Sequence, residues 1–143
     1  MPFDTLGPLN YLVTLAGAIV DGAQAGVPEV FSTRLSCYVL VGEATMDQRT
    51  VSGVESGTVR RDQQYIVVLG YRVDGHEQDA ELALATAQPL VIAALYADRT
   101  LGGTVKSIRV DTSLVGAPAY GGIGNQETRL YPIGVSCLQD HTI

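Results

Sequence analysis

The chain has 143 residues, 46% hydrophobic and 17% charged, which suits a single globular domain. Its formal net charge is −6, and Lys106 is the only lysine among its nine basic residues. A groove that wraps nucleic acid needs clustered positive charge, so this balance argues against one, although DNA could still move through a space that the protein lines.

The first predicted element is a helix over residues 6–25. Thr5 is placed to cap it, and Gly22 with Gly26 closes it. The apolar side chains follow a spacing of three and four that puts them on one stripe: Leu9, Leu12, Val13, Ala16, Ile19 and Val20. We expect this stripe to lie on an apolar partner surface within the domain.

Two strands are predicted next, over residues 31–41 and 64–73, because apolar residues alternate there with a period of two. In the first strand Phe31, Cys37 and Val39 share a face with polar residues opposite. In the second strand both faces are nearly apolar, with Tyr65 on one and Val68 on the other. This pattern predicts a place inside the sheet, or a face covered by another subunit.

Between these strands, residues 43–62 are polar and show no clear period. Loops of this length are uncommon in compact domains and are often functional or mobile. Two interpretations are open: a disordered loop, or an arm or projecting hairpin that reaches a neighbour in an assembly. Arg49, Arg60 and Arg61 in this segment could face phosphate or a partner's carboxylates, with simple solvation as the alternative.

A second helix is predicted from about Asp74, where Asp74 and Glu77 have capping-box spacing, to about Asp98. Pro89 falls in its middle and should kink the helix or split it near Gln88; we predict a kink.

Two further strands are predicted over residues 107–114 and 128–138, joined by a glycine-rich connection over residues 116–126. The order α-β-β-α-β-β indicates an α+β fold. Its expected form is a four-stranded, mostly antiparallel sheet with two helices packed on one face, in a single domain over residues 1–143.

Residues that could carry catalysis are few, and no nucleophile elbow, Walker loop or H-E-x-x-H motif is present. The best metal candidate is the acidic cluster Asp74, His76, Glu77, Asp79 and Glu81. Its spacing fits neither a calcium loop nor a zinc site, and acidic residues are expected at a helix start in any case. We therefore predict no catalytic residue, no metal site and no cofactor.

Cys37 and Cys137 lack the spacing of metal ligands. Two free, buried thiols in a reducing compartment are the favoured interpretation, with a bridge between adjacent strands left open. No secretory signal is predicted, and the longest apolar stretches are interrupted, so no membrane span is expected.

Residues 80–137 resemble the carboxyl half of siphophage tail terminator and tail completion proteins. The match is carried by a helix ending Ala-Ala-Leu-Tyr-Ala-Asp at residues 93–98, followed at once by Arg-Thr-Leu-Gly-Gly-Thr-Val and two strands. Gly102 and Gly103 would let the chain turn sharply, while Leu101 covers the helix end. The residues of this turn are also the predicted interface: Asp98, Arg99, Leu101, Gly102 and Gly103.

The resemblance implies a structural subunit and not an enzyme. Such a subunit would form a homo-hexameric ring on the head-proximal end of the tail tube, end tube polymerisation and join the tube to a head-tail connector or head-completion protein. DNA would pass through the ring without sequence-specific binding. The chain would belong to the tail or neck of a virion and would be in the host cytoplasm during assembly.

Two alternatives remain at this point. The chain could be another phage tail-tube or head-completion subunit, which has similar size and element content. Less favoured is a small bacterial ligand-binding or enzymatic domain, which would need a pocket with converging polar groups.

Overall fold

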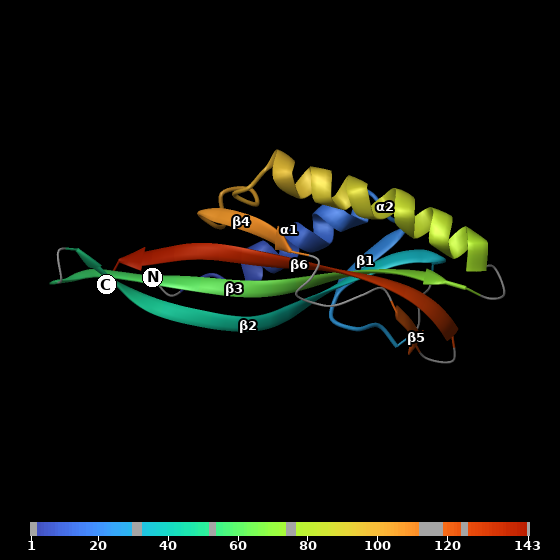
Figure 1. The fold of residues 1–143 in the computed structure, drawn as a ribbon, viewed down its shortest axis with the longest axis horizontal. Helices are drawn as coiled ribbons and strands as arrows, with labels where there is room; N and C mark the ends of the chain where they lie inside the picture. The colour runs from blue at the N-terminus through green and yellow to red at the C-terminus, as the bar shows by residue number, and fades with distance from the viewer. Residues whose placement is uncertain are drawn as a thin grey trace.

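The computed structural model describes residues 3–29, 33–51, 54–73, 77–111, 119–123 and 126–142. They form an α+β fold in which two helices lie on one face of a long, mixed sheet (Figure 1). The elements in chain order are α1 (Leu6–Gly17), β1 (Gly22–Ala25), β2 (Leu35–Val51), β3 (Val54–Arg72), α2 (Glu77–Ala97), β4 (Ser107–Asp111), β5 (Ala119–Ile123) and β6 (Gln126–Thr142).

The sheet has the order β1-β2-β3-β6-β4, and β5 also pairs with β6. β1 runs parallel to β2, and every other pair is antiparallel. The prediction of four strands is therefore wrong, because the described residues contain six. The two missed strands are short: β1 is Gly-Ala-Gln-Ala and β5 contains two adjacent glycines, so neither shows the alternation that marks a strand.

Helix α1 is shorter than predicted. It ends at Gly17, and residues 22–25, which were expected to continue it, form β1 instead. Thr5 occupies the N-cap position, but its side chain makes no capping bond. The carboxylate of Asp4 takes this role, because its Oδ1 accepts a hydrogen bond from Gly7 N at 2.8 Å.

The described residues of the segment 43–62, namely 43–51 and 54–62, are strands and not a disordered loop. β2 and β3 continue through them as an antiparallel pair, from Ala44 opposite Gln63 to Val51 opposite Val54, and β6 lies along the other edge of β3. We call this three-stranded part the arm: residues 41–51 of β2, 54–64 of β3 and 137–142 of β6. In Figure 1 the arm runs past both helices.

The core lies between the helices and the sheet. One face of β2, β3 and β6 packs against α1 and α2, and β3, with partners on both edges, is inside the sheet as predicted. A smaller cluster on the opposite face contains Tyr38 and Val68. The largest fully buried side chains are Tyr65, Leu12, Leu69, Leu84, Leu95, Leu101, Ile133, Val39, Val67, Val73, Val91 and Val135.

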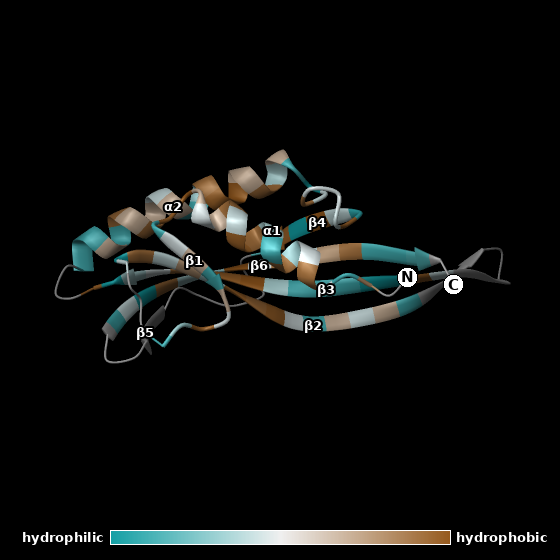
Figure 2. Cartoon of the chain, turned by 180° about the vertical axis from the view of Figure 1, so that it is seen from behind, coloured by the Kyte–Doolittle hydropathy of each residue, from teal (hydrophilic) through white to brown (hydrophobic). Residues whose placement is uncertain are grey.

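Helix α2 continues through Pro89 without a break, so the alternative of a split near Gln88 is wrong, and the kink stays a prediction. Its buried residues recur at a spacing of three and four: Ala80, Leu84, Ala87, Val91 and Leu95. By length and composition alone α2 is long and apolar enough to cross a membrane, a test that the core helix of a soluble protein also passes. Figure 2 shows hydrophobic colouring on much of α2 beyond its hydrophilic first turn.

Both cysteines are free and buried, as the favoured interpretation predicted. They lie on β2 and β6, with β3 between them. Burial raises the pKa of each thiol to about 12, so both remain protonated at neutral pH.

Candidate functional site

The turn after α2 is organised by the carboxylate of Asp98. Its Oδ1 accepts hydrogen bonds from Thr100 N at 3.1 Å and Thr100 Oγ1 at 2.7 Å. Its Oδ2 accepts one from Gly102 N at 2.9 Å and one from the hydroxyl of Tyr11 on α1 at 3.1 Å. These donors favour the ionised carboxylate, and the Thr100 hydroxyl has the largest effect. Together they lower the pKa of Asp98 from 3.8 to about 2.

This pKa makes a prediction about acid stability. Since the folded pKa is below the ordinary value, ionised Asp98 contributes stability that is complete above about pH 4 and is lost as the pH falls toward 2. Asp98→Asn should therefore be less stable than the wild type at neutral pH, with a difference that shrinks across this range. Urea denaturation at a series of pH values measures it. Tyr11→Phe, which removes one donor, should shift the profile in the same direction but by less, and a difference independent of pH would contradict the assignment.

Three consecutive residues of the turn have positive φ: Leu101 at 47°, Gly102 at 69° and Gly103 at 83°. This conformation is unfavourable for a residue with a Cβ atom, and the side chain of Leu101 is fully buried. That it covers the helix end stays a prediction. At Gly102 a Cβ atom would lie 3.0 Å from the ring of Tyr11. The turn thus fastens α2 to α1.

The interface assignment of this turn is only partly compatible with the structure. Leu101 is 0% exposed, so the assignment is wrong for its side chain, and the carboxylate of Asp98 is bonded within the chain. Arg99, Gly102 and Gly103 are exposed, and the guanidinium of Arg99 lies 4.9 Å from the ring centre of Tyr96. For these three residues the interface stays a prediction.

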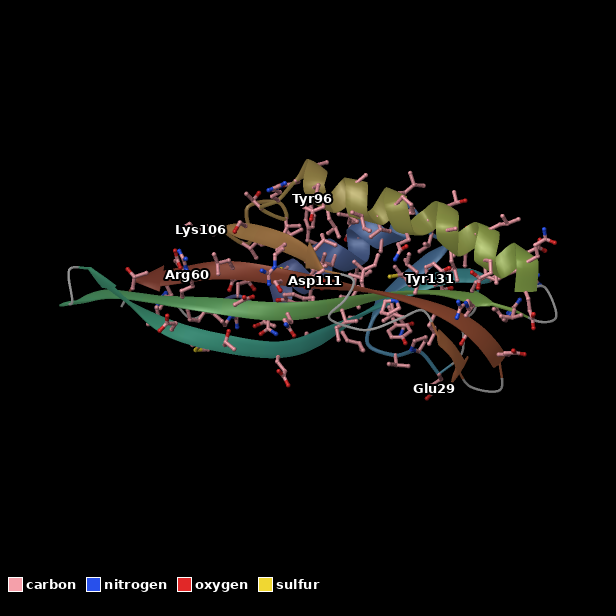
Figure 3. The ribbon with its side chains drawn as sticks, in the orientation of Figure 1. Glu29, Arg60, Tyr96, Lys106, Asp111 and Tyr131 are labelled. Atoms are coloured by element: carbon pink, nitrogen blue, oxygen red, sulfur yellow. The ribbon has the colours of Figure 1, made fainter. Side chains whose placement is uncertain are left out.

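Two of the arm arginines, Arg60 and Arg61, have different partners within the chain. Arg60 forms a two-point ion pair with Asp140 on β6, through Nε at 2.8 Å and Nη2 at 3.1 Å. Lys106 Nζ donates to Oδ2 of the same carboxylate at 3.0 Å; Figure 3 labels both Arg60 and Lys106. The hydrogen bond from Arg60 holds the pKa of Asp140 far below its ordinary range. The side chain of Arg49 lies outside the described part of the chain.

For Arg61 the partner-facing assignment is wrong. Its side chain is buried, because successive strand residues point to opposite faces and Arg61 faces the helix side. There Nη1 donates to Thr5 Oγ1 at 2.9 Å, and Nη2 donates to Asp4 O at 3.0 Å and to Gln139 Oε1 at 2.8 Å.

Arg61 is the centre of a set of contacts that sequence reasoning missed, and which we call the N-terminal clamp. Gln139 Nε2 donates to Asp4 O at 2.7 Å, and the hydroxyl of Tyr65 donates to Thr5 O at 2.9 Å. The ring of Phe3 lies 5.0 Å below the Arg61 guanidinium. The clamp binds residues 3–5 to the base of the arm. The sequence feature that could have revealed the clamp is the strand alternation, which places Arg61 on the same face as Tyr65.

The acidic start of α2 has a structural use. Glu81 accepts hydrogen bonds from Arg129 Nε and from the Tyr131 hydroxyl, which ties the helix to β6. Asp74 and His76 lie outside the described residues. Among the residues that the structure describes, no group of three or more His, Cys, Asp or Glu side chains could hold a metal ion.

No protein-family model matches the chain, and no curated protein matches it. The fold, however, is similar to a solved structure: the sheath/tube terminator of an extracellular contractile injection system, PVC, in its extended state. The TM-score is 0.51 at 13% sequence identity. The likeness covers 100% of this chain and 59% of that one, so the chain spans somewhat more than half the length of the terminator. The chain therefore shares its fold with this sheath/tube terminator.

Proposed function

We propose that this chain is a structural subunit that terminates the tube of a phage-like tail. The observation that carries the proposal is the likeness of the whole chain to a sheath/tube terminator. A separate line of support is the turn at residues 98–105, whose sequence resembles that of siphophage tail terminators. The two lines differ in kind, since one is a backbone comparison and the other a local sequence pattern.

In its detailed form, the proposal is a ring of this subunit, six in number, at the head-proximal end of the tube in a phage neck. The ring would stop tube growth, offer its other side to a connector or head-completion protein and let DNA pass through its centre. A net charge of −6 supports passage without binding, because an acidic wall repels the phosphate backbone. In this role the chain performs no chemical step and needs no cofactor.

The test is to measure the mass of the purified chain by light scattering at two concentrations and to image it by negative stain, alone and with tail tubes of its own particle. Rings of about six subunits, or a cap at one end of each tube, are the expected result. Long tubes formed by the chain alone would instead identify a tube subunit. A chain that stays monomeric and ignores tube ends would contradict the proposal.

A further inference from the structure

The outward face of α2 is unusual for a surface helix, because residues 82–97 include no charged side chain. Leu82 is 60% exposed, Leu90 53% and Tyr96 42%, the last labelled in Figure 3. A helix on a protein surface normally carries charged residues opposite its buried stripe, and an apolar outer face indicates that something covers it. We call this outward side of residues 82–97 the α2 face.

One end of the α2 face is hollowed into an apolar groove of about 370 Å³. Leu82, Thr86 and Leu90, which are one helical turn apart, form its α2 wall, and Ile19 and Leu35 lie opposite. A flexible, unbranched apolar side chain from a partner would fit such an irregular groove.

The arm carries a second apolar surface. Val41 is 47% exposed and Met46 is 64% exposed. They share a face with Ala44. Val41 lies opposite Tyr65 of β3, Ala44 opposite Gln63 and Met46 opposite Arg61, and these three β3 residues alternate along one face of the strand. That is the face on which the helices lie, but the arm extends past them. We call Val41, Ala44 and Met46 the arm strip.

We propose that the arm strip of one copy docks on the α2 face of the next copy. Each copy has a net charge of −6, so contact between copies is least costly where neither surface is charged, and both of these surfaces meet that condition. The α2 face is long enough to accept the whole arm strip, since Val41 to Met46 spans at most about 16 Å of strand and Leu82 to Tyr96 spans about 21 Å of helix. Met46 is the side chain that enters the groove.

Such a contact is heterologous, since each copy offers its arm to one neighbour and its α2 face to another. Repeated contacts of this kind close into a ring or grow as a filament. The inference therefore rests on the proposed ring and specifies which two surfaces of the chain form it.

A cross-linking experiment tests the pairing directly. Met46→Cys and Leu90→Cys are made in separate chains, which are mixed and oxidised, so a disulfide between the two chains requires contact between copies. We expect a cross-linked dimer in this mixture. A mixture of Met46→Cys with Gln78→Cys, which places the thiol on the exposed first turn of α2, should give none. The native thiols stay in both mixtures because they are buried.

A charge substitution gives the second measurement. Leu90→Glu should weaken self-association by about 30-fold or more, because the carboxylate would be buried without a partner. Gln78→Glu is the matched control and should assemble as the wild type does. Circular dichroism and the unfolding midpoint of Leu90→Glu should be unchanged, since Leu90 is half exposed.

The two proposals fail in different ways. If the wild type forms rings, and Leu90→Glu forms them equally well without the expected cross-link, the docking inference is overturned and the ring proposal stands. If the wild type is monomeric up to its solubility limit, with and without tubes, both are overturned. Assembly that is lost in Leu90→Glu, together with the specific cross-link, supports both.

Discussion

Replacing Arg61 with methionine should lower the free energy of unfolding by about 2–4 kcal/mol. Methionine keeps most of the apolar stem but removes the three hydrogen bonds of the N-terminal clamp to Thr5, Asp4 and Gln139. Gln139 is 7% exposed, so its Oε1 would lose its donor in a place that water does not reach easily. Urea denaturation followed by circular dichroism gives the change.

Arg60→Met is the control for this measurement, because it alters the neighbouring residue of the same strand. Arg60 is paired with Asp140 at the surface, and exposed ion pairs contribute little, so its unfolding midpoint should stay close to that of the wild type. Hydrogen exchange at residues 4 and 5 should rise in Arg61→Met and not in Arg60→Met. Equal effects of the two substitutions would show that the clamp does not exist as described.

Leu101→Ala should destabilise the fold by about 2–5 kcal/mol, the range for removing a fully buried leucine side chain. Leu101 is 0% exposed although it lies in a turn between α2 and β4, where sequence alone would suggest a surface residue. Leu6→Ala is the control, because Leu6 is 64% exposed and its change should be small. Thermal and urea unfolding of both variants measure the difference.

The positive φ of Leu101 adds a second, sharper expectation. At most positions glycine is less stable than alanine, because it loses more backbone freedom on folding. At a φ of 47° a Cβ atom is itself unfavourable, so Leu101→Gly should be at least as stable as Leu101→Ala. If alanine is clearly the more stable of the two, residue 101 does not adopt this backbone conformation in solution.

The parts of the fold that could be predicted are those in which a long element buries one side. The apolar stripe of α2 and the alternation around Tyr65 and Val67 identified the second helix and the central strand correctly. The arm gave no such signal. Its strands carry polar residues on both faces, so the pairing of Thr45 with Asp62 depends on backbone hydrogen bonds and on β6 alongside, neither of which appears in a local sequence pattern.

For the candidate site, residue type was a poor guide to exposure. Arg60 and Arg61 look equivalent in the sequence, but the pleat of β3 sends one to the surface and the other into the N-terminal clamp. The clamp joins Asp4 to Gln139, and contact between such distant positions depends on the tertiary fold. The turn at Asp98 was recognised from its glycines, whereas the bond from Tyr11 required the placement of α1.

The position of β6 in the middle of the sheet has a consequence for the order of folding. β2 and β3 are neighbours in sequence and can zip together as a hairpin, but the other edge of β3 pairs only with residues 128–142. Even the shortest loop closed by this pairing, from Arg72 to Thr128, contains α2, β4 and β5. Closing this loop lowers the entropy of the chain before the contacts between β3 and β6 can offset the loss. We therefore expect β6 to pair with β3 late and slowly. Until it does, one edge of a long hairpin stays open, and other unfinished chains can pair with that edge.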